Sequence, residues 1–322
     1  MTVIVTGAAG FIGAAVAQRL LARGEQVIGV DEFNAYYDPA LKEARAARLE
    51  ANPAFRMVRM DIADAAAMAC LVAEPSVSGV VHLAAQAGVR YSIDNPFAYE
   101  HSNLAGHLSV MEACRHAPAA PCLVYASSSS VYGDRAGSGA FLESDPVDKP
   151  VSLYAATKRS CELMSEAYAK LYGFPVSGLR FFTVYGPWGR PDMAYFSFTR
   201  KILAGEAIDV FGEGRMARDF TYIDDIVDGV IGVLDNPGVR GEHRIFNIGD
   251  NRPVGLMRMI EVLEGALGRK ADKVFLPMQP GDVSETYADI SRLQALTGYA
   301  PKVSLEDGIP KFVDWYRAFY GT

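Results

Sequence analysis

Short apolar runs rich in Val and Ile alternate with longer amphipathic stretches through the first half of the chain. Strands that are apolar throughout are buried on both faces, and helices between them serve as crossover connections. The pattern therefore predicts an α/β protein built on a Rossmann-like, doubly wound parallel sheet. The expected strands are TVIVTG, QVIGV, FRMVRMD, GVVHLAA, CLVYASS and VSGLRFF, and the expected helices are 11–23, 40–51, 64–73, 96–117 and 152–172.

The alternation loosens after residue 183. Short strand patterns such as IDVFG and RDFTY lie there among helices expected near 224–235, 254–267 and 305–320. We predict that 1–183 forms the doubly wound domain and that 184–322 forms a smaller C-terminal α/β substrate domain. The segment at about 222–250, which contains RIFNIG, is expected to return to the main sheet.

Composition excludes several classes of protein. The chain has 322 residues, 50% of them hydrophobic, so it can bury a large core, and its net charge of −7 argues against a nucleic-acid binder. No apolar run is long enough to span a membrane, so we expect no membrane partner. We expect a cytoplasmic protein without a metal site, because its cysteines form no CxxC pair and fit buried thiols in a reducing compartment. They are Cys70, Cys114, Cys122 and Cys161.

Gly7, Gly10 and Gly13 stand between the first expected strand and helix, in VTGAAGFIG. Glycines at this spacing allow a tight turn and let a pyrophosphate sit on the unpaired N–H groups of the helix. Asp31 ends the second strand, where a carboxylate can accept hydrogen bonds from an adenosine ribose and repel a 2′-phosphate. The set predicts NAD rather than NADP; a purely structural turn and a surface carboxylate are the alternative interpretations.

Tyr154 and Lys158 lie four positions apart in PVSLYAATKRS, on one face of an expected helix. Ser128 ends the fifth strand in YASSSSVYG, at the carboxyl edge of the sheet where ligands bind in doubly wound folds. A Tyr and a Lys at this spacing also occur by chance, so the context decides. With the glycine turn, these residues resemble the Ser, Tyr and Lys of the extended short-chain dehydrogenase/reductase superfamily, which implies proton and hydride transfer.

A phenol ordinarily has a pKa of about 10, so it works as a base near neutrality only beside positive charge. Lys158 and the nicotinamide of NAD+ are expected to supply that charge. Tyr154 would then take the proton of a sugar hydroxyl while hydride leaves the same carbon, and Ser128 would hydrogen-bond that oxygen.

Other residues are expected to contact NAD where the turn and the next strands end. Asp61 and Ile62 follow the third strand and are placed to meet the adenine, and HLAA at 82–85 closes the fourth strand. The expected cofactor residues are Gly7, Gly10, Phe11, Ile12, Gly13, Asp31, Asp61, Ile62, Leu83, Ala84, Ala85, Tyr154, Lys158 and Tyr185.

Longer segments narrow the resemblance. NAYYDPALKEARAARL, HLAAQAGVRYSIDNP, LRFFTVYGPWGRPDMA, RDFTYIDDIVDGV and LPMQPGDVSETYAD look like UDP-glucuronate 4-epimerases over nearly the whole chain. The resemblance implies epimerisation of UDP-glucuronate to UDP-galacturonate at C4, through a 4-keto intermediate and with tightly held NAD. Ser129 and Ser130 stand where related dehydratases carry an Asp-Glu pair and decarboxylases carry a Glu. No acid is therefore available there as a proton shuttle for elimination.

The same resemblance implies which residues bind the substrate. Arg218 is expected at the diphosphate, and Thr183 and Arg190 are expected at the sugar carboxylate. In the loop before Arg190, Gly186 and Gly189 are expected to form either a mobile wall beside the sugar or a structural turn. The expected substrate residues are Arg90, Ser128, Ser129, Thr183, Arg190, Arg215, Arg218 and Asp282.

Other functions remain open on the sequence alone. They are a UDP-glucuronate decarboxylase, another sugar-nucleotide epimerase or dehydratase, and a non-catalytic NAD-sensing regulator. The apolar sides of helices 96–117 and 152–172 are expected to pack against a second copy in a homodimer, although a covered core face has the same pattern.

Overall fold

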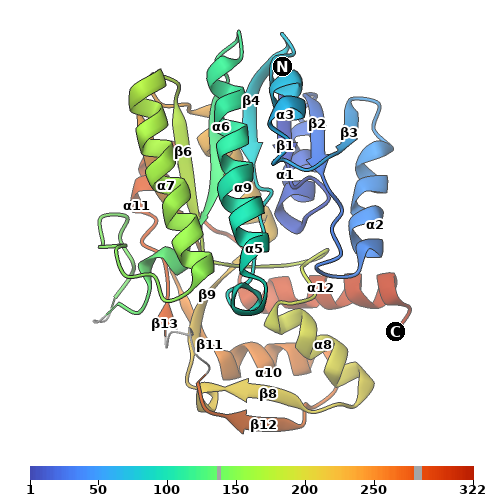
Figure 1. The fold of residues 1–322 in the computed structure, drawn as a ribbon. Coiled ribbons are helices and arrows are strands. Elements are labelled where there is room, and N and C mark those ends of the chain that lie inside the picture. The colour runs from blue at the N-terminus through green and yellow to red at the C-terminus, as the bar shows by residue number, and fades with distance from the viewer. Residues whose placement is uncertain (136–138, 279–284) are drawn as a thin grey trace.

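A parallel sheet forms the centre of the molecule (Figure 1). The computed structural model describes residues 1–135, 139–278 and 285–322. Within these residues the large sheet has seven strands, all paired in parallel, which confirms the predicted doubly wound arrangement. From one edge to the other, the strands are β10 (His243–Ile248), β6 (Val176–Phe181), β5 (Cys122–Ser128), β4 (Val77–His82), β1 (Thr2–Thr6), β2 (Gln26–Asp31) and β3 (Phe55–Arg59).

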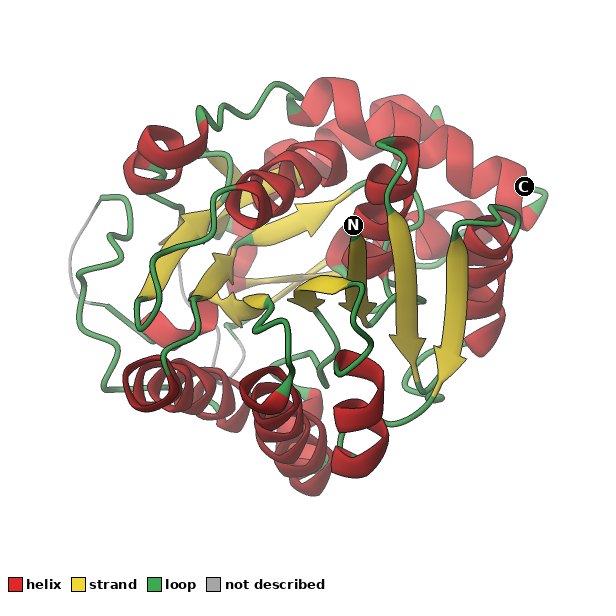
Figure 2. Cartoon of the chain, turned by 90° about the horizontal axis from the view of Figure 1, so that it is seen from above, coloured by secondary structure: helices red, strands yellow, loops and turns green. Residues whose placement is uncertain are grey.

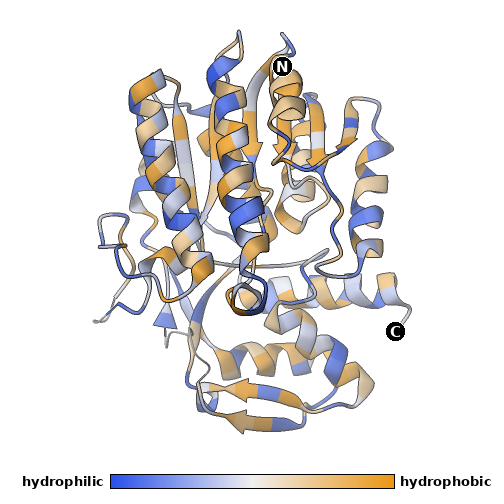
Figure 3. Cartoon of the chain, in the orientation of Figure 1, coloured by the Kyte–Doolittle hydropathy of each residue, from blue (hydrophilic) through white to orange (hydrophobic). Residues whose placement is uncertain are grey.

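Helices cover both faces of this sheet (Figure 2). One layer contains α1 (Phe11–Ala22), α2 (Pro39–Glu50), α9 (Ile223–Asp235) and α11 (Ser291–Thr297), and the other contains α3 (Ala65–Val72), α6 (Gly106–His116) and α7 (Leu153–Tyr172). Several strands of the sheet are largely hydrophobic, whereas the helices alternate between hydrophobic and hydrophilic residues (Figure 3). In β1, Val3 and Val5 join one buried cluster and Ile4 joins the other. This alternation produces two cores, one on each face of the sheet.

A smaller lobe lies beyond the carboxyl ends of the strands, at the bottom of Figure 1. The strands expected at IDVFG and RDFTY are present in it, whereas its other strands were too short to predict. The elements are β8 (Ile208–Phe211), β12 (Lys273–Leu276), α8 (Ala194–Ala204), α10 (Leu256–Leu267), β7 (Thr183–Tyr185), β9 (Ala217–Tyr222), β11 (Pro253–Gly255), β13 (Glu285–Thr286) and α12 (Leu305–Tyr320). Within the lobe, Phe312 of α12 packs against Tyr195 and Phe196 of α8.

The chain passes between the two lobes more than once. After α8 and β8, α9 packs on α1, and β10 pairs with β6 at the edge of the large sheet. These elements span the segment that was expected to return to the main sheet. The division of the chain at residue 183 stays a prediction.

The helix expected at 96–117 is three elements rather than one. After the short α4 (Tyr91–Asp94), α5 (Pro96–Tyr99) leads into a π-helical turn at Glu100–Ala105 and then into α6. A π-turn adds a residue to the helical repeat, and such turns are common near functional sites. Here it carries Asn103, whose Oδ1 accepts a hydrogen bond from Gln86 N at 2.8 Å.

Candidate active site

A cavity of about 770 Å³ opens at the carboxyl ends of the parallel strands. It extends from the glycine turn after β1 to Phe211 and Leu256 of the smaller lobe. Doubly wound folds bind ligands at this edge, and clefts between lobes are common ligand sites. Its position is that of the ligand sites in such folds.

The glycine turn allows a close approach of backbone segments. Gly7 has φ +71°, and a Cβ at this position would lie 2.8 Å from Ala84 N. A Cβ on Gly13 would lie 2.0 Å from Gly7 O, so α1 can start so near to β1 only with glycine there. α1 begins at Phe11 after Gly10 without a side-chain cap. Its first N–H groups are therefore available to a ligand phosphate.

Two carboxylates stand at the ends of β2 and β3, Asp31 as the last residue of β2 and Asp61 two residues after β3. Asp31 is 8% exposed; its Oδ2 accepts a hydrogen bond from Ala9 N at 3.0 Å and its Oδ1 one from Phe33 N at 2.9 Å. Asp61 lies 2.6 Å from His101 Nε2. Burial alone would raise the pKa of Asp61, but the hydrogen bond to His101 holds it below its ordinary value. Both side chains line the cavity.

Ser128, Tyr154 and Lys158 all line this cavity. Ser152 caps α7 by accepting a hydrogen bond from Ala155 N at 3.1 Å, which places Tyr154 in the first turn of the helix. Lys158 is 5% exposed, and its Nζ donates to the Ala126 carbonyl of β5 at 2.9 Å. This bond fixes the lysine side chain between the helix and the strand.

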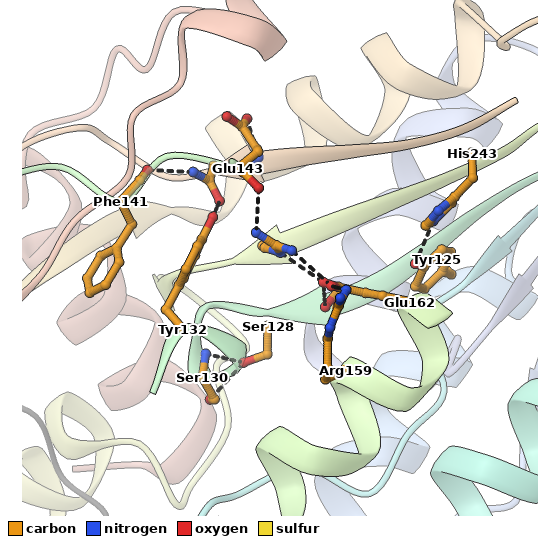
Figure 4. A network of polar contacts seen from close by, with 12 residues as sticks. Tyr125, Ser128, Ser130, Tyr132, Phe141, Glu143, Arg159, Glu162 and His243 are labelled. Atoms are coloured by element: carbon orange, nitrogen blue, oxygen red, sulfur yellow. Dashed lines mark hydrogen bonds and ion pairs between the residues drawn. The ribbon is translucent and has the colours of Figure 1, made fainter. Parts of the chain in front are cut away.

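The end of β5 is held by a buried network behind these residues (Figure 4). Glu162 follows Lys158 by one turn of α7, and its side chain is fully buried. Its carboxylate accepts hydrogen bonds from Ser127 Oγ at 2.6 Å and from Arg180 at 2.8 and 2.9 Å. Burial alone would raise the pKa of Glu162, but Arg180 holds it below its ordinary value. Glu162 therefore ties α7 to β5 and β6 as a carboxylate.

Several predicted substrate residues also line the cavity. They are Arg90, Ser128, Ser129, Thr183, Arg190 and Arg218. Arg190 Nε donates to Asp192 Oδ1 at 3.0 Å, and Asp192 Oδ2 accepts a hydrogen bond from Tyr36 at 3.2 Å. Burial alone would lower the pKa of Arg190, but Asp192 raises it above the ordinary value. The guanidinium is therefore charged and oriented in the cavity wall.

The prediction for Tyr185 is wrong. Its side chain does not line the cavity but is fully buried, and its hydroxyl donates to Ser304 O at 2.8 Å. Its ring packs edge-on against Tyr195 and Tyr222. The space is taken by the start of α12, since a Cβ on Gly308 would lie 2.3 Å from the Tyr185 hydroxyl oxygen.

Arg215 does not line the cavity either. It is exposed and lines a smaller hollow with Met216 and Met278. Asp282 lies outside the described residues. The structure accounts for the two loop glycines by close packing, because a Cβ on Gly189 would lie 1.9 Å from the Tyr195 hydroxyl oxygen and one on Gly186 would lie 2.7 Å from Ile223.

Sequence reasoning missed Phe181, Asp192 and Tyr36, which also line the cavity. Burial, with the nearby charge of Asp192, raises the pKa of Tyr36 to about 12, so its hydroxyl stays a donor. The sequence did offer a signal for two of these residues, because Tyr36 lies in the segment NAYYDP and Asp192 lies in GRPDMA. Their hydrogen bond could not be predicted, because it forms only when the fold brings the segment after β2 next to the loop after β7.

Comparisons with known proteins agree with this geometry. A model of the NAD dependent epimerase/dehydratase family matches residues 3–249, from β1 through β10. UDP-glucuronate 4-epimerase 1 of Arabidopsis thaliana is 49% identical over 100% of this chain and 78% of its own. Protein CapI of Staphylococcus aureus is 46% identical over 99% of both chains. The crystal structure of UDP-glucuronic acid 4-epimerase from Bacillus cereus, in complex with UDP-glucuronic acid and NAD, has a TM-score of 0.92 and 37% identity, covering 99% of this chain and 100% of that chain.

A doubly wound sheet with a glycine turn, and with a Ser, a Tyr and a Lys at its carboxyl edge, defines a class of dinucleotide-dependent enzymes. The chain belongs to one family of this class, the NAD dependent epimerase/dehydratase family. In the described part of the chain, no helix has both the length and the apolar character needed to cross a membrane.

Proposed function

We propose that this chain epimerises UDP-glucuronate to UDP-galacturonate at C4 with NAD as its cofactor. The proposal rests on one observation: Ser128, Tyr154 and Lys158 line the same cavity as the glycine turn. The likeness to UDP-glucuronate 4-epimerases extends over the whole chain and supports the choice of substrate.

The residues of the cavity fit a bound dinucleotide. The glycine turn leaves no room for Cβ atoms, α1 offers free N–H groups, and Asp31 and Asp61 stand where the adenosine would lie. Bound NAD would accept a hydride from C4 of the sugar and return it. The predicted cofactor residues other than Tyr185 all line this part of the cavity.

Tyr154 acts in the proposed mechanism as base and then as acid. Its phenolate takes the proton of the C4 hydroxyl as C4 loses its hydride, which leaves a 4-keto sugar. Lys158 supplies positive charge beside the phenolate, and Ser128 Oγ donates a hydrogen bond to the C4 oxygen. The ring turns over, C4 receives the hydride on its opposite face, and Tyr154 returns the proton. Atoms and electrons balance, so no other reactant is consumed.

The same cavity disfavours elimination. Ser129 lines the cavity beside Ser128, and the Ser130 hydroxyl lies 2.9 Å from Ser128 Oγ. Neither hydroxyl is acidic enough to shuttle the proton that loss of water across C5 and C6 requires. A dehydratase outcome is therefore disfavoured.

Thr183 and Arg190 are proposed to bind the sugar carboxylate, with Arg90 as a helper. A 4-keto uronate is a β-keto acid that can lose CO2 as charge flows from the carboxylate into the ring. Hydrogen bonds that stabilise the carboxylate hinder this loss. The pair would thus both select the uronate and protect it during the reaction.

The decisive experiment is incubation of the purified protein with UDP-glucuronate and no added NAD, followed by NMR of the products. We expect a mixture of UDP-glucuronate and UDP-galacturonate with no change in mass. Formation of a UDP-pentose and CO2 would indicate a decarboxylase, and no turnover of any UDP-sugar would indicate a non-catalytic NAD-binding protein.

The proposed assembly is a homodimer through the outer faces of α6 and α7. Leu163 is 55% exposed and Leu171 is 70% exposed on α7, and Leu108 on α6 is 40% exposed. These side chains form an apolar surface on two neighbouring helices, which a second copy of the same surface would cover.

A further inference from the structure

Arg45 of α2 is buried without a carboxylate beside it. It is 1% exposed, and among the described residues no Asp or Glu forms an ion pair with it. Its Nη1 donates to Ala9 O at 3.1 Å and to the Tyr37 hydroxyl at 2.7 Å. The other donors go to Trp188 O, from Nε at 3.0 Å and from Nη2 at 2.6 Å, and to Gly189 O at 3.0 Å. All five N–H donors of the guanidinium are therefore used.

The backbone that Arg45 holds is strained. Trp188 has φ +63°, in the left-handed region that residues other than glycine rarely adopt. A strained residue of this kind persists only where its surroundings enforce the conformation. Two hydrogen bonds from Arg45 to the Trp188 carbonyl provide that restraint, and the Trp188 ring packs 5.2 Å from Trp315 and from Phe319.

Arg190 follows this strained segment directly. Its guanidinium reaches the cavity and pairs with Asp192. Because Arg45 fixes the carbonyls of the two preceding residues, it sets the backbone position from which Arg190 extends. The same side chain also holds Ala9 O in the glycine turn, so it joins the cofactor end of the cavity to the sugar end.

We propose that Arg45 is a positioning residue that sets selectivity for an anionic sugar by holding the Trp188–Gly189 carbonyls and thereby placing Arg190. This inference rests on the proposed function, in which Arg190 binds the substrate carboxylate. Lys cannot replace Arg45, because an ammonium group has no planar fork to reach carbonyls on two segments. A misplacement of about 1 Å at a binding group can cost up to about 100-fold in rate.

The test is the Arg45→Lys enzyme, which keeps the buried charge and the apolar stem. With saturating NAD, we expect KM for UDP-glucuronate to rise by about tenfold while the inhibition constant of UDP changes less than about twofold. The matched control is Arg48→Met, one turn along α2: Arg48 lies 4.5 Å from the Trp188 ring but donates nothing to its carbonyl. We expect that control to leave both constants unchanged.

A purely structural role would change both constants together. Equal changes for UDP-glucuronate and UDP, or no change in a folded Arg45→Lys enzyme, would overturn the inference. So would an equal rise in KM when Arg45→Lys is added to Arg190→Ala, because the effect must act through Arg190. If Arg45→Lys does not fold, Tyr37→Phe removes one acceptor of the same guanidinium and must raise KM for UDP-glucuronate selectively by about two- to threefold.

An error in the proposed function can be told apart from an error in the inference about Arg45, because it shows in the parent enzyme. If the parent enzyme binds UDP-glucuronate but does not epimerise it, the proposed reaction is wrong, and calorimetric binding constants for UDP-glucuronate and UDP then replace KM and the inhibition constant. If the parent binds UDP-glucuronate no better than UDP, the inference about Arg45 is wrong as well.

Discussion

Tyr154 and Lys158 occupy successive turns of α7, so one helix carries the proposed base and its cationic neighbour. Ser128 comes from the end of β5, and the Ala126 carbonyl of the same strand holds Lys158. The relative positions of all three residues therefore depend on how α7 packs against β5.

Replacement of Tyr154 by Phe should remove turnover and leave the fold intact. Without the hydroxyl, no group takes the C4 proton, and we expect a loss of at least about 100-fold in kcat with UDP-glucuronate. Tyr168→Phe is the control, since Tyr168 lies on the same helix but donates to Glu112 at 2.8 Å, outside the cavity. Turnover by a folded, NAD-loaded Tyr154→Phe enzyme at the parent rate would disprove the assigned role.

Replacement of Thr183 by Ala should change the product rather than the fold. A hydrogen bond to a charged group is worth about 1.5–3 kcal/mol, so its loss should raise the share of UDP-pentose and CO2 by about tenfold or more. NMR of the sugar products and trapping of CO2 measure this share. An unchanged product ratio with normal substrate affinity would contradict protection of the carboxylate.

The proposed catalytic and cofactor residues could be placed at the cavity from the sequence because each follows from a local pattern. Gly13 and Lys158 belong to a turn and to a helix repeat whose geometry the neighbouring residues determine. The burial of Tyr185 away from the cavity was not predictable, because the space around it is filled by α12, which lies more than 100 residues later in the chain. Arg45 was missed because all but one of its acceptors are backbone carbonyls, which leave no signature in the sequence.

At the scale of elements, the contact between α7, β5 and β6 depends on Glu162 and Arg180, whose side chains are 0% and 3% exposed. Loss of one partner leaves a buried charge without compensation. We expect Arg180→Met to lower the free energy of unfolding by about 3–5 kcal/mol, as measured by urea denaturation.

Arg159→Met is the control for this pair, because Arg159 also donates to Glu162 but its side chain is 32% exposed. Its loss should cost less than about 1 kcal/mol. The double variant Glu162→Met, Arg180→Met should be more stable than Arg180→Met, since it leaves no unpaired charge. Equal losses for Arg159→Met and Arg180→Met would contradict the assigned importance of burial.

Glu264 of α10 gives the smaller lobe a dependence on pH. Burial alone would raise the pKa of Glu264, but its bonds to Lys270, at 2.7 Å, and Lys273 lower it to about 2. A lowered pKa stabilises the fold above the unfolded value of about 4.5 and loses this effect as pH falls towards 2.

We therefore expect Glu264→Gln to lower the free energy of unfolding at pH 7 by about 1–2 kcal/mol, and the gap from the parent to narrow between pH 5 and pH 3. Urea denaturation across this range measures the gap. Glu261→Gln on the same helix is the control, because the Glu261 side chain is 62% exposed beside Arg258, and its effect should be small at every pH. A gap that stays constant with pH would contradict the role of the carboxylate charge.

Most long elements were predictable because their apolar period is sustained. CLVYASS coincides with β5, and the helix expected at 305–320 coincides with α12. The short strands β7, β11 and β13 were missed because two or three residues carry no period, and each is defined by its pairing with β9. The π-turn before α6 was missed because it keeps the helical composition on both sides.

At the scale of the whole molecule, the proposed homodimer is open to a direct test. Charges at Leu163 and Leu171 would be buried without partners in the interface, so Leu163→Asp with Leu171→Asp should give a monomer by light scattering. Val239→Asp is the control, because Val239 is 73% exposed beyond α9. A parent protein that is monomeric at micromolar concentration would contradict the proposal.

The pairing of β10 with β6 also determines when the protein can fold during its synthesis. The edge of the large sheet stays incomplete until residue 248 has left the ribosome, although β6 ends at Phe181. Contacts between distant segments slow folding, because the intervening chain must first be ordered. The edge of β6 therefore stays unpaired while residues 182–248 are translated, and an unpaired strand edge is prone to association with other chains.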